Sequence, residues 1–295
     1  MTTKAEVVLA GLVLAAVSIG APARAEVSVG KPAAAGKTGA VIGKPAAPAK
    51  KPATKLDPRG VAVVTAPAIV PAADLLATAK RLRDAAAAKD GEAVAALIAD
   101  EVTVVSSSLD LAAAPSVTRE GPYTEAADLL AVVGRNAGGG GDVPPGTPKA
   151  VVDERLQARA FAHIVASIDA ADWGRDPRVK GGFCTHRGRT WNAAAVRILA
   201  KGPGAVTGGT VAKAVPVRTA GHSNAGFAGT LAPGLLYLEA SEIESPEGWR
   251  AVRLPTGRVG FVEGDVLRTP TTSGICFLPN VDGGWLMSAV VGVGP

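Results

Sequence analysis

The sequence predicts an α+β protein in which a small strand-rich domain is inserted into, or appended to, a helix-rich α+β domain. Three observations favour this fold class. Apolar residues recur at helical spacing over Ala72–Lys89. Residues 210–268 hold short β-branched and aromatic runs separated by glycines, which is typical of strands and turns. Residues 275–291 carry two apolar runs around Asp282-Gly283-Gly284, a pattern that indicates a β-hairpin.

The first 25 residues have the pattern of a cleaved secretory signal peptide. Lys4 precedes an apolar run, Val7–Ile19, and Ala23-Arg24-Ala25 follows as a small-x-small cleavage site. The run is shorter than the roughly 20 apolar residues that span a bilayer, so cleavage after Ala25 is favoured over an uncleaved anchor. We therefore expect an exported protein, periplasmic or secreted, with no transmembrane segment in the mature chain.

Residues 26–70 are predicted to be a disordered linker. Near-repeats such as Gly30-Lys31-Pro32 and Gly43-Lys44-Pro45 supply Pro, Ala and Lys but few large apolar side chains. Such a segment buries too little apolar surface to offset the entropy lost on ordering. The net charge of +5 belongs to leader and linker, because residues 1–60 hold nine Lys or Arg and three Asp or Glu. The remainder is near neutral, which argues against a nucleic-acid-binding domain.

The helix-rich α+β domain is predicted to cover residues 71–205, with residues 269–295 returning to it. An Asp90-Gly91 break separates its first two helices, and a run led by an acidic residue, Glu101–Ser106, predicts a strand. Thr124 is predicted to cap a later helix. Helices are predicted at residues 72–89, 92–99, 124–133, 150–171 and 192–200.

The chain contains two cysteines, Cys184 and Cys276. In an exported protein an even number of cysteines favours a disulfide, which here would join the helix-rich domain to the terminal hairpin. The alternative is a nucleophilic thiol, since His186 lies two residues after Cys184. The pattern lacks a third, orienting group, so the disulfide is favoured.

The remaining polar residues form no pattern for catalysis or metal binding. His163 is predicted on a helix and His222 in a loop, and three scattered histidines do not make a metal-ligand cluster. Asp169, Asp172 and Asp176 are predicted to form a solvated acidic helix end, with weak cation binding as the alternative. We therefore expect no catalytic residue, no metal and no cofactor.

A series of short motifs follows between Pro216 and Leu267. It contains a Val-Arg start ending at Arg218, a Gly-Trp-x-x-Val strand from Gly248 and a Gly-x-x-Gly-aromatic-Val strand from Gly257. This order resembles a bacterial SH3-like domain, which implies a small β-barrel that serves as a binding module. The implied partner is peptidoglycan or an envelope protein, and the protein would be non-catalytic. The resemblance implies four binding residues, Arg218, Tyr237, Trp249 and Phe261. The alternative place for Tyr237 and Trp249 is the barrel core, which is favoured for Trp249. Phe261 occupies a position where such domains more usually have a tryptophan.

A second resemblance involves both ends of the helix-rich domain. Residues 72–106 give helix, Asp-Gly break, helix and strand, and residues 273–291 give a strand, an Asp-Gly turn and a Gly-Trp-led strand. Together they resemble the opening and closing parts of the cone-shaped α+β fold of the nuclear transport factor 2 superfamily. This implies that the SH3-like module is an insertion. It also leaves an alternative function, an enzyme or small-ligand binder, which a deep pocket with convergent titratable groups would favour.

Overall fold

The computed structural model describes residues 60–137, 144, 146–200 and 205–293 of the protein. The predicted signal peptide and residues 26–59 of the predicted linker lie outside these ranges. The chain divides into two units, 1–51 and 52–295, and the described residues all belong to the second. They form an α+β structure, as the sequence predicts. Among them, no helix has both the length and the apolar character needed to cross a bilayer.

The first of two main sheets has five strands in the order β4-β3-β14-β13-β5. Neighbouring strands are antiparallel except β14 and β3, which run parallel. The terminal hairpin therefore pairs on both sides with strands from much earlier in the chain, and residues 185–273 intervene between two strands of one sheet. The strands are β3 (Ile98–Ser107), β4 (Ser116–Glu120), β5 (Phe183–Cys184), β13 (Gly274–Pro279) and β14 (Trp285–Val293).

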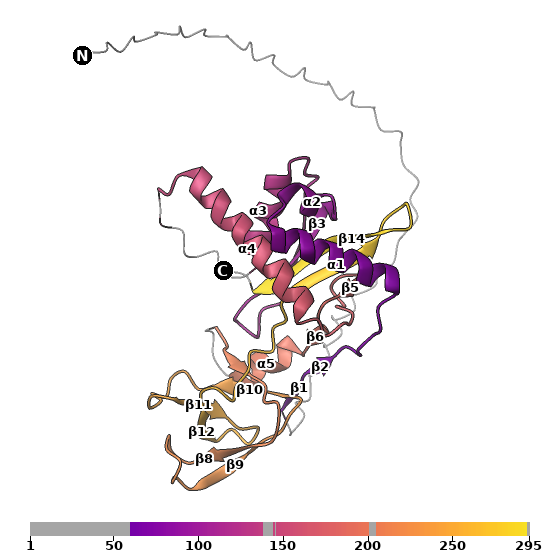
Figure 1. The fold of residues 1–295 in the computed structure, drawn as a ribbon. Helices are drawn as coiled ribbons and strands as arrows, with labels where there is room; N and C mark the ends of the chain where they lie inside the picture. The colour runs from indigo at the N-terminus through magenta and orange to yellow at the C-terminus, as the bar shows by residue number, and fades with distance from the viewer. Residues whose placement is uncertain (1–59, 138–143, 145, 201–204, 294–295) are drawn as a thin grey trace, which may run out of the picture. The chain divides into compact units, whose positions relative to one another are not determined.

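Four helices cover one face of this sheet, with α1 lying against β14 and α4 against β13 (Figure 1). The sheet residues Phe277 and Met287 are fully buried in one core with Leu75 and Leu82, two turns apart on α1, and with Ile164 of α4. The apolar faces of these amphipathic helices therefore pack against the sheet. The helices are α1 (Ala73–Ala88), α2 (Gly91–Ala95), α3 (Ala126–Asn136) and α4 (Lys149–Asp169).

Several local predictions differ from the structure. The predicted second helix ends early, because Ile98 already belongs to β3 and is buried in the sheet. Thr124 is not the N-cap of α3; Glu125 occupies that position without a side-chain cap. Strand β4 was not expected, since its residues are almost all exposed and give no apolar alternation.

The second sheet is built by the strand-rich region in the order β1-β10-β11-β12-β8-β9, with β7 also pairing β10. The predicted closed barrel is absent from the described residues. Its closure would need β9 to pair with β10, but β7 and β1 pair with β10 instead, so β9 remains an edge strand. The strands are β1 (Val61–Ala62), β7 (Gly208–Gly209), β8 (Val215–Arg218), β9 (Phe227–Leu231), β10 (Leu235–Glu239), β11 (Trp249–Arg253) and β12 (Val259–Glu263).

The end of the predicted disordered linker is ordered, which corrects the boundary at residue 70. After β1, strand β2 (Val64–Thr65) pairs with β6 (Arg189–Thr190), and Ala68 bridges Gly174. The pattern of β-branched residues from Val61 onward explains the difference, because Val61 is buried beside helix α5 (Ala193–Ala200). This segment therefore hydrogen-bonds on one side to strand β10 of the second sheet, and on the other to strand β6, which follows β5 in the chain.

Candidate functional site

Three of the four predicted binding residues lie on one outer face of the second sheet. Phe261 pairs across strands with Arg218 on one side and with Ala251 on the other, and Trp249 lies two residues before Ala251. Cross-strand partners share a face, so these side chains project away from the core that Val217, Val252 and Val262 form on the opposite side. The face is continued by Phe227 of the edge strand, which pairs with Arg218 and is 66% exposed. We call Phe227, Arg218 and Phe261 the aromatic row.

Two loops border the aromatic row. The loop between β8 and β9 is closed by a hydrogen bond from Thr219 N to Gly226 O, and Arg218 donates to Ala225 O. It meets the loop between β10 and β11 at Gly221, where an added Cβ would lie 2.7 Å from Pro246 Cδ and 3.4 Å from Trp249 Cβ. Glycine at this position therefore allows both loops to approach the tryptophan.

Trp249 and Tyr237 do not line one groove, because they lie on opposite faces of the second sheet. Trp249 was predicted to lie inside a barrel, but it is only partly buried and belongs to the outer face. Tyr237 is buried in the core, and its hydroxyl accepts from Ala232 N at 2.6 Å and donates to Ala232 O. Burial raises the pKa of this phenol. Tyr237 thus anchors the turn after β9 rather than joining the aromatic row.

The predicted disulfide between Cys184 and Cys276 is present in the structure. The two residues are direct cross-strand partners of β5 and β13, and both side chains are fully buried. They lie on the sheet face opposite the helices, in a small apolar cluster with Val179 and Ala289. The bond occupies both thiols, and none of the described cysteines is free.

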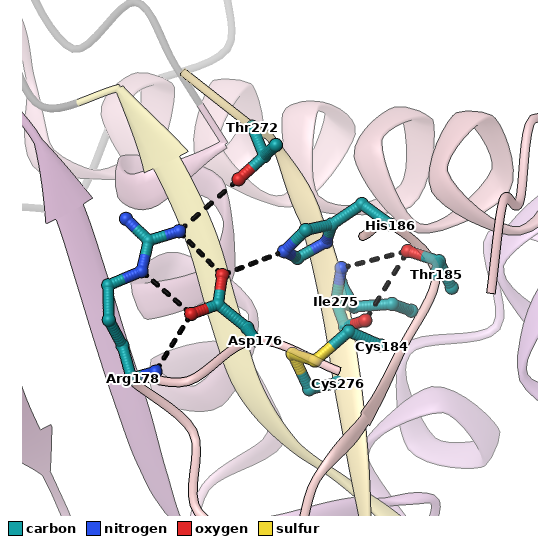
Figure 2. Close-up of a disulfide and its surroundings, with 8 residues drawn as sticks. All are labelled: Asp176, Arg178, Cys184, Thr185, His186, Thr272, Ile275 and Cys276. Carbon is teal, nitrogen blue, oxygen red and sulfur yellow. Dashed lines mark hydrogen bonds and ion pairs between the residues drawn. A yellow bond between two sulfur atoms is a disulfide. The ribbon is translucent and has the colours of Figure 1, made fainter. Parts of the chain in front are cut away.

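A buried ion network lies beside the disulfide (Figure 2). Asp176 is 1% exposed and accepts hydrogen bonds from the Arg178 side chain and, at 3.1 Å, from His186 Nε2. Arg178 also donates to Ser107 at the end of β3 and to Thr272 before β13. Burial alone would raise the pKa of Asp176, but the hydrogen bonds from Arg178 and His186 hold it well below its usual range.

The acidic residues expected to form one solvated helix end are therefore separated. Asp169 pairs with Arg83 of α1, Asp172 pairs with Arg187, and Asp176 is buried in the network just described. No acidic cluster that could hold a cation forms from these three side chains, and each one instead fixes a different contact.

A polar cavity of about 330 Å³ opens between α4 and the segment after β5. Its lining includes His163 from α4, Asp172 from the following loop, and Arg187 and Arg189 from the segment that leads into β6. Hydroxyl groups complete the wall, from Thr65, Ser167, Thr185, Thr272 and Ser273. We call it the Arg189 cavity.

Two histidines at this cavity keep one buried ring nitrogen each without a hydrogen-bond partner. In His186, Nε2 faces the Asp176 carboxylate and Nδ1 has no partner. In His163, the Gly274 carbonyl accepts from the ring and Nε2 has no partner. Burial lowers the pKa of His163, the nearby His186 lowers it further, and the Gly274 carbonyl acts in the opposite direction. Unpaired buried nitrogens are costly, so they mark this region as functionally interesting.

Sequence reasoning missed both the aromatic row's third member and the Arg189 cavity. Phe227 lies in a Gly-, Ala- and Ser-rich stretch, and its signal was an aromatic residue in a chain with only 4% aromatics. The cavity residues come from four separate segments and have no common spacing, and only the run from Cys184 to Arg189, rich in polar residues, pointed to them.

A closely spaced set of potential metal ligands comprises Cys184, His186 and Cys276, whose ligand atoms lie within 4.8 Å of one another. With the sulfurs bonded to each other, this set offers no thiolate to a metal. His222 belongs to the loop between β8 and β9, where its N–H donates to Ala220 O.

Comparison of the chain with known protein families, with curated proteins and with solved structures found no match. The two family resemblances therefore rest on the motifs alone, and function has to be argued from the geometry described above.

Proposed function

We propose that this protein is an exported, envelope-associated, non-catalytic binding protein whose SH3-like module contacts a cell-wall peptide through the aromatic row. The observation that carries the proposal is the cross-strand register, which places Phe227, Arg218 and Phe261 side by side on the outer face of the sheet. The row combines two exposed or half-exposed rings with a guanidinium. Aromatic residues and arginine are the types most enriched where proteins bind partners.

The chemistry of the row favours a peptide that carries a carboxylate. A guanidinium offers a planar fork of donors that matches a carboxylate. Within the described part of the chain, the Arg218 guanidinium donates one hydrogen bond, to Ala225 O, so most of its donors are available to a ligand. The flanking phenylalanines supply apolar surface for the peptide chain on either side. Because β9 is an edge strand, an extended peptide could also pair with its free backbone groups.

Two features support export. The first 25 residues have the pattern of a signal peptide, and the disulfide is of the kind that persists in oxidising compartments. A cell-wall peptide is the partner that this compartment and the SH3-like motif order together favour.

The test is co-sedimentation of the purified full-length mature protein with isolated peptidoglycan sacculi. Phe227→Ala and Arg218→Ala are expected to weaken binding at least about fivefold each, as truncation of a central contact does. Phe227 is 66% exposed, so its loss should leave the fold intact, which a thermal melt checks.

Matched controls come from exposed residues of the first sheet. Val281→Ala removes an exposed apolar side chain at the turn between β13 and β14, and Arg119→Ala removes an exposed arginine on β4. Both variants should sediment like the parent. If the aromatic-row variants also sediment like the parent, or if the parent itself stays in the supernatant, the proposal fails.

A second candidate function is small-ligand binding by the helix-rich α+β domain that contains the first sheet. The Arg189 cavity favours it, because titratable groups from separate segments converge there. This function would be exercised by a different part of the chain from the aromatic row, so the two can be tested independently.

A further inference from the structure

The charges around the Arg189 cavity do not balance. Arg187 donates to Asp172 at 2.7 Å, and this pair is partly exposed. Arg189 also lines the cavity, and among the ion pairs of the described residues none involves it. The buried Asp176 carboxylate is held by Arg178 and His186 and does not line the cavity. The cavity therefore carries an uncompensated positive charge.

The remaining lining supplies hydrogen-bond donors that suit an anion. Thr65 lies on β2, Thr185 follows β5, and Thr272 and Ser273 precede β13, so hydroxyls approach from three separate segments. Thr185 Oγ1 donates to the Ile275 carbonyl and accepts from Ile275 N, so it is already engaged. Thr272 Oγ1 accepts from Arg178, which leaves its O–H, with those of Thr65, Ser167 and Ser273, to donate to a ligand. A volume of about 330 Å³ is at the lower end of the range of small-molecule pockets, about 300–1,000 Å³.

We propose that the Arg189 cavity binds a small oxyanion, a carboxylate or a phosphate group, with Arg189 as its principal charge partner. Arginine presents several donors in a fixed plane and is suited to either group. The proposal rests on the second candidate function and names its ligand class, and it is independent of the aromatic row, with which the cavity shares no residue.

His163 gives the site an expected pH dependence. Its Nε2 is buried without a partner, so a proton there is disfavoured while the cavity is empty, and an anion nearby would compensate that proton. Binding should then take up a proton and tighten as pH falls. The charged and titratable groups that line the cavity with His163 are Asp172, from the loop after α4, and His186, Arg187 and Arg189, from the segment after β5.

Calorimetric titration of the full-length mature protein with sodium sulfate, sodium phosphate and sodium acetate tests the proposal. One saturable site is expected for at least one of these probes, and the strongest of them tells whether the source of the oxyanion is phosphate-like or carboxylate-like. Arg189→Gln should weaken binding at least tenfold. Arg268→Gln is the matched control, since Arg268 lies with Arg189 at a neighbouring cavity but does not line this one, and it should bind like the parent.

Sulfate serves for the pH series because it does not titrate between pH 6 and pH 8. Its affinity should rise toward pH 6, by at most about tenfold per unit for one proton taken up, and His163→Gln should remove this slope while retaining binding. Thermal melts of all variants verify the fold. Absence of saturable binding by any probe overturns the proposal, as does equal loss in the Arg189 and Arg268 variants. A cavity that binds Zn²⁺ but none of the oxyanions overturns it too. A slope that survives in His163→Gln overturns the role of His163.

Discussion

Reduction of the Cys184–Cys276 disulfide should destabilise the protein by an amount set by its loop. The two cysteines are 92 residues apart, and for such a loop the chain-entropy relation gives about 4–5 kcal/mol of stabilisation through the unfolded state. The native state should change little, because the two cysteines are fully buried cross-strand partners in the β5–β13 ladder, which the backbone holds together. The cost of reduction should therefore fall on the unfolded state.

Urea unfolding of the same protein with and without a phosphine reductant measures this difference without any amino-acid substitution. With a slope of about 2–3 kcal/mol per M and a loss of about 4–5 kcal/mol, the midpoint should fall by about 1.3–2.5 M on reduction. A variant with both cysteines replaced by alanine should unfold at one midpoint regardless of reductant. Mass spectrometry of a non-reduced digest should join the peptide of Cys184 to that of Cys276.

Two results would refute this reasoning. A difference below about 1 kcal/mol between oxidised and reduced protein would show that loop closure does not dominate, for example because the unfolded chain retains structure. Two alkylatable thiols in unfolded protein that has never met a reductant would show that the bond is absent.

Three further predictions follow from particular contacts. Gly134→Ala should destabilise the protein by at least about 1–3 kcal/mol in urea, because the added Cβ would lie 2.0 Å from Leu156 O where α3 meets α4, whereas Arg135→Ala, exposed on the same turn, should stay within about 0.5 kcal/mol. Trp249→Ala should cost less than the about 3–5 kcal/mol of a fully buried aromatic, and a larger loss would show that the side chain is core. Because the pKa of Asp176 is lower in the folded protein than its value of 3.8 in the unfolded chain, its ionised form stabilises the fold at pH values above 3.8. The free energy of unfolding should therefore fall as the pH drops from about 5 to 2, and Asp176→Asn should flatten this dependence. An unchanged slope in that variant would contradict the reasoning.

Helix α1 and the terminal hairpin of the first sheet could be predicted, because the residues that specify each of them are close together in the sequence. The apolar positions of α1 recur at helical spacing, and the terminal hairpin carries its own turn signal in Asp282-Gly283-Gly284, so both appear near the expected residues. The disulfide was also predictable, since two cysteines in a chain with a predicted signal peptide leave a single intramolecular pairing.

Other features depend on which segments meet in space. Strand β4 has no apolar alternation, and pairing with β3 alone makes it a strand. The second sheet stays open because Val61–Ala62 and Gly208–Gly209, neither of which gives a strong strand signal, pair with β10. Two-residue strands draw their stability from a neighbour, so sequence patterns could not specify this outcome.

The sequence by itself determined the fold class, the helices that cover the first sheet, the return of the hairpin and the disulfide pair, because each depends on periodicity, turn residues or cysteine count. Only the tertiary structure decided that Phe227 joins Arg218 and Phe261, that Trp249 faces outward, and that Arg189 meets His163 at a polar cavity. The physical reason is that register and packing bring together residues from distant segments, and each of those residues has an ordinary local sequence around it.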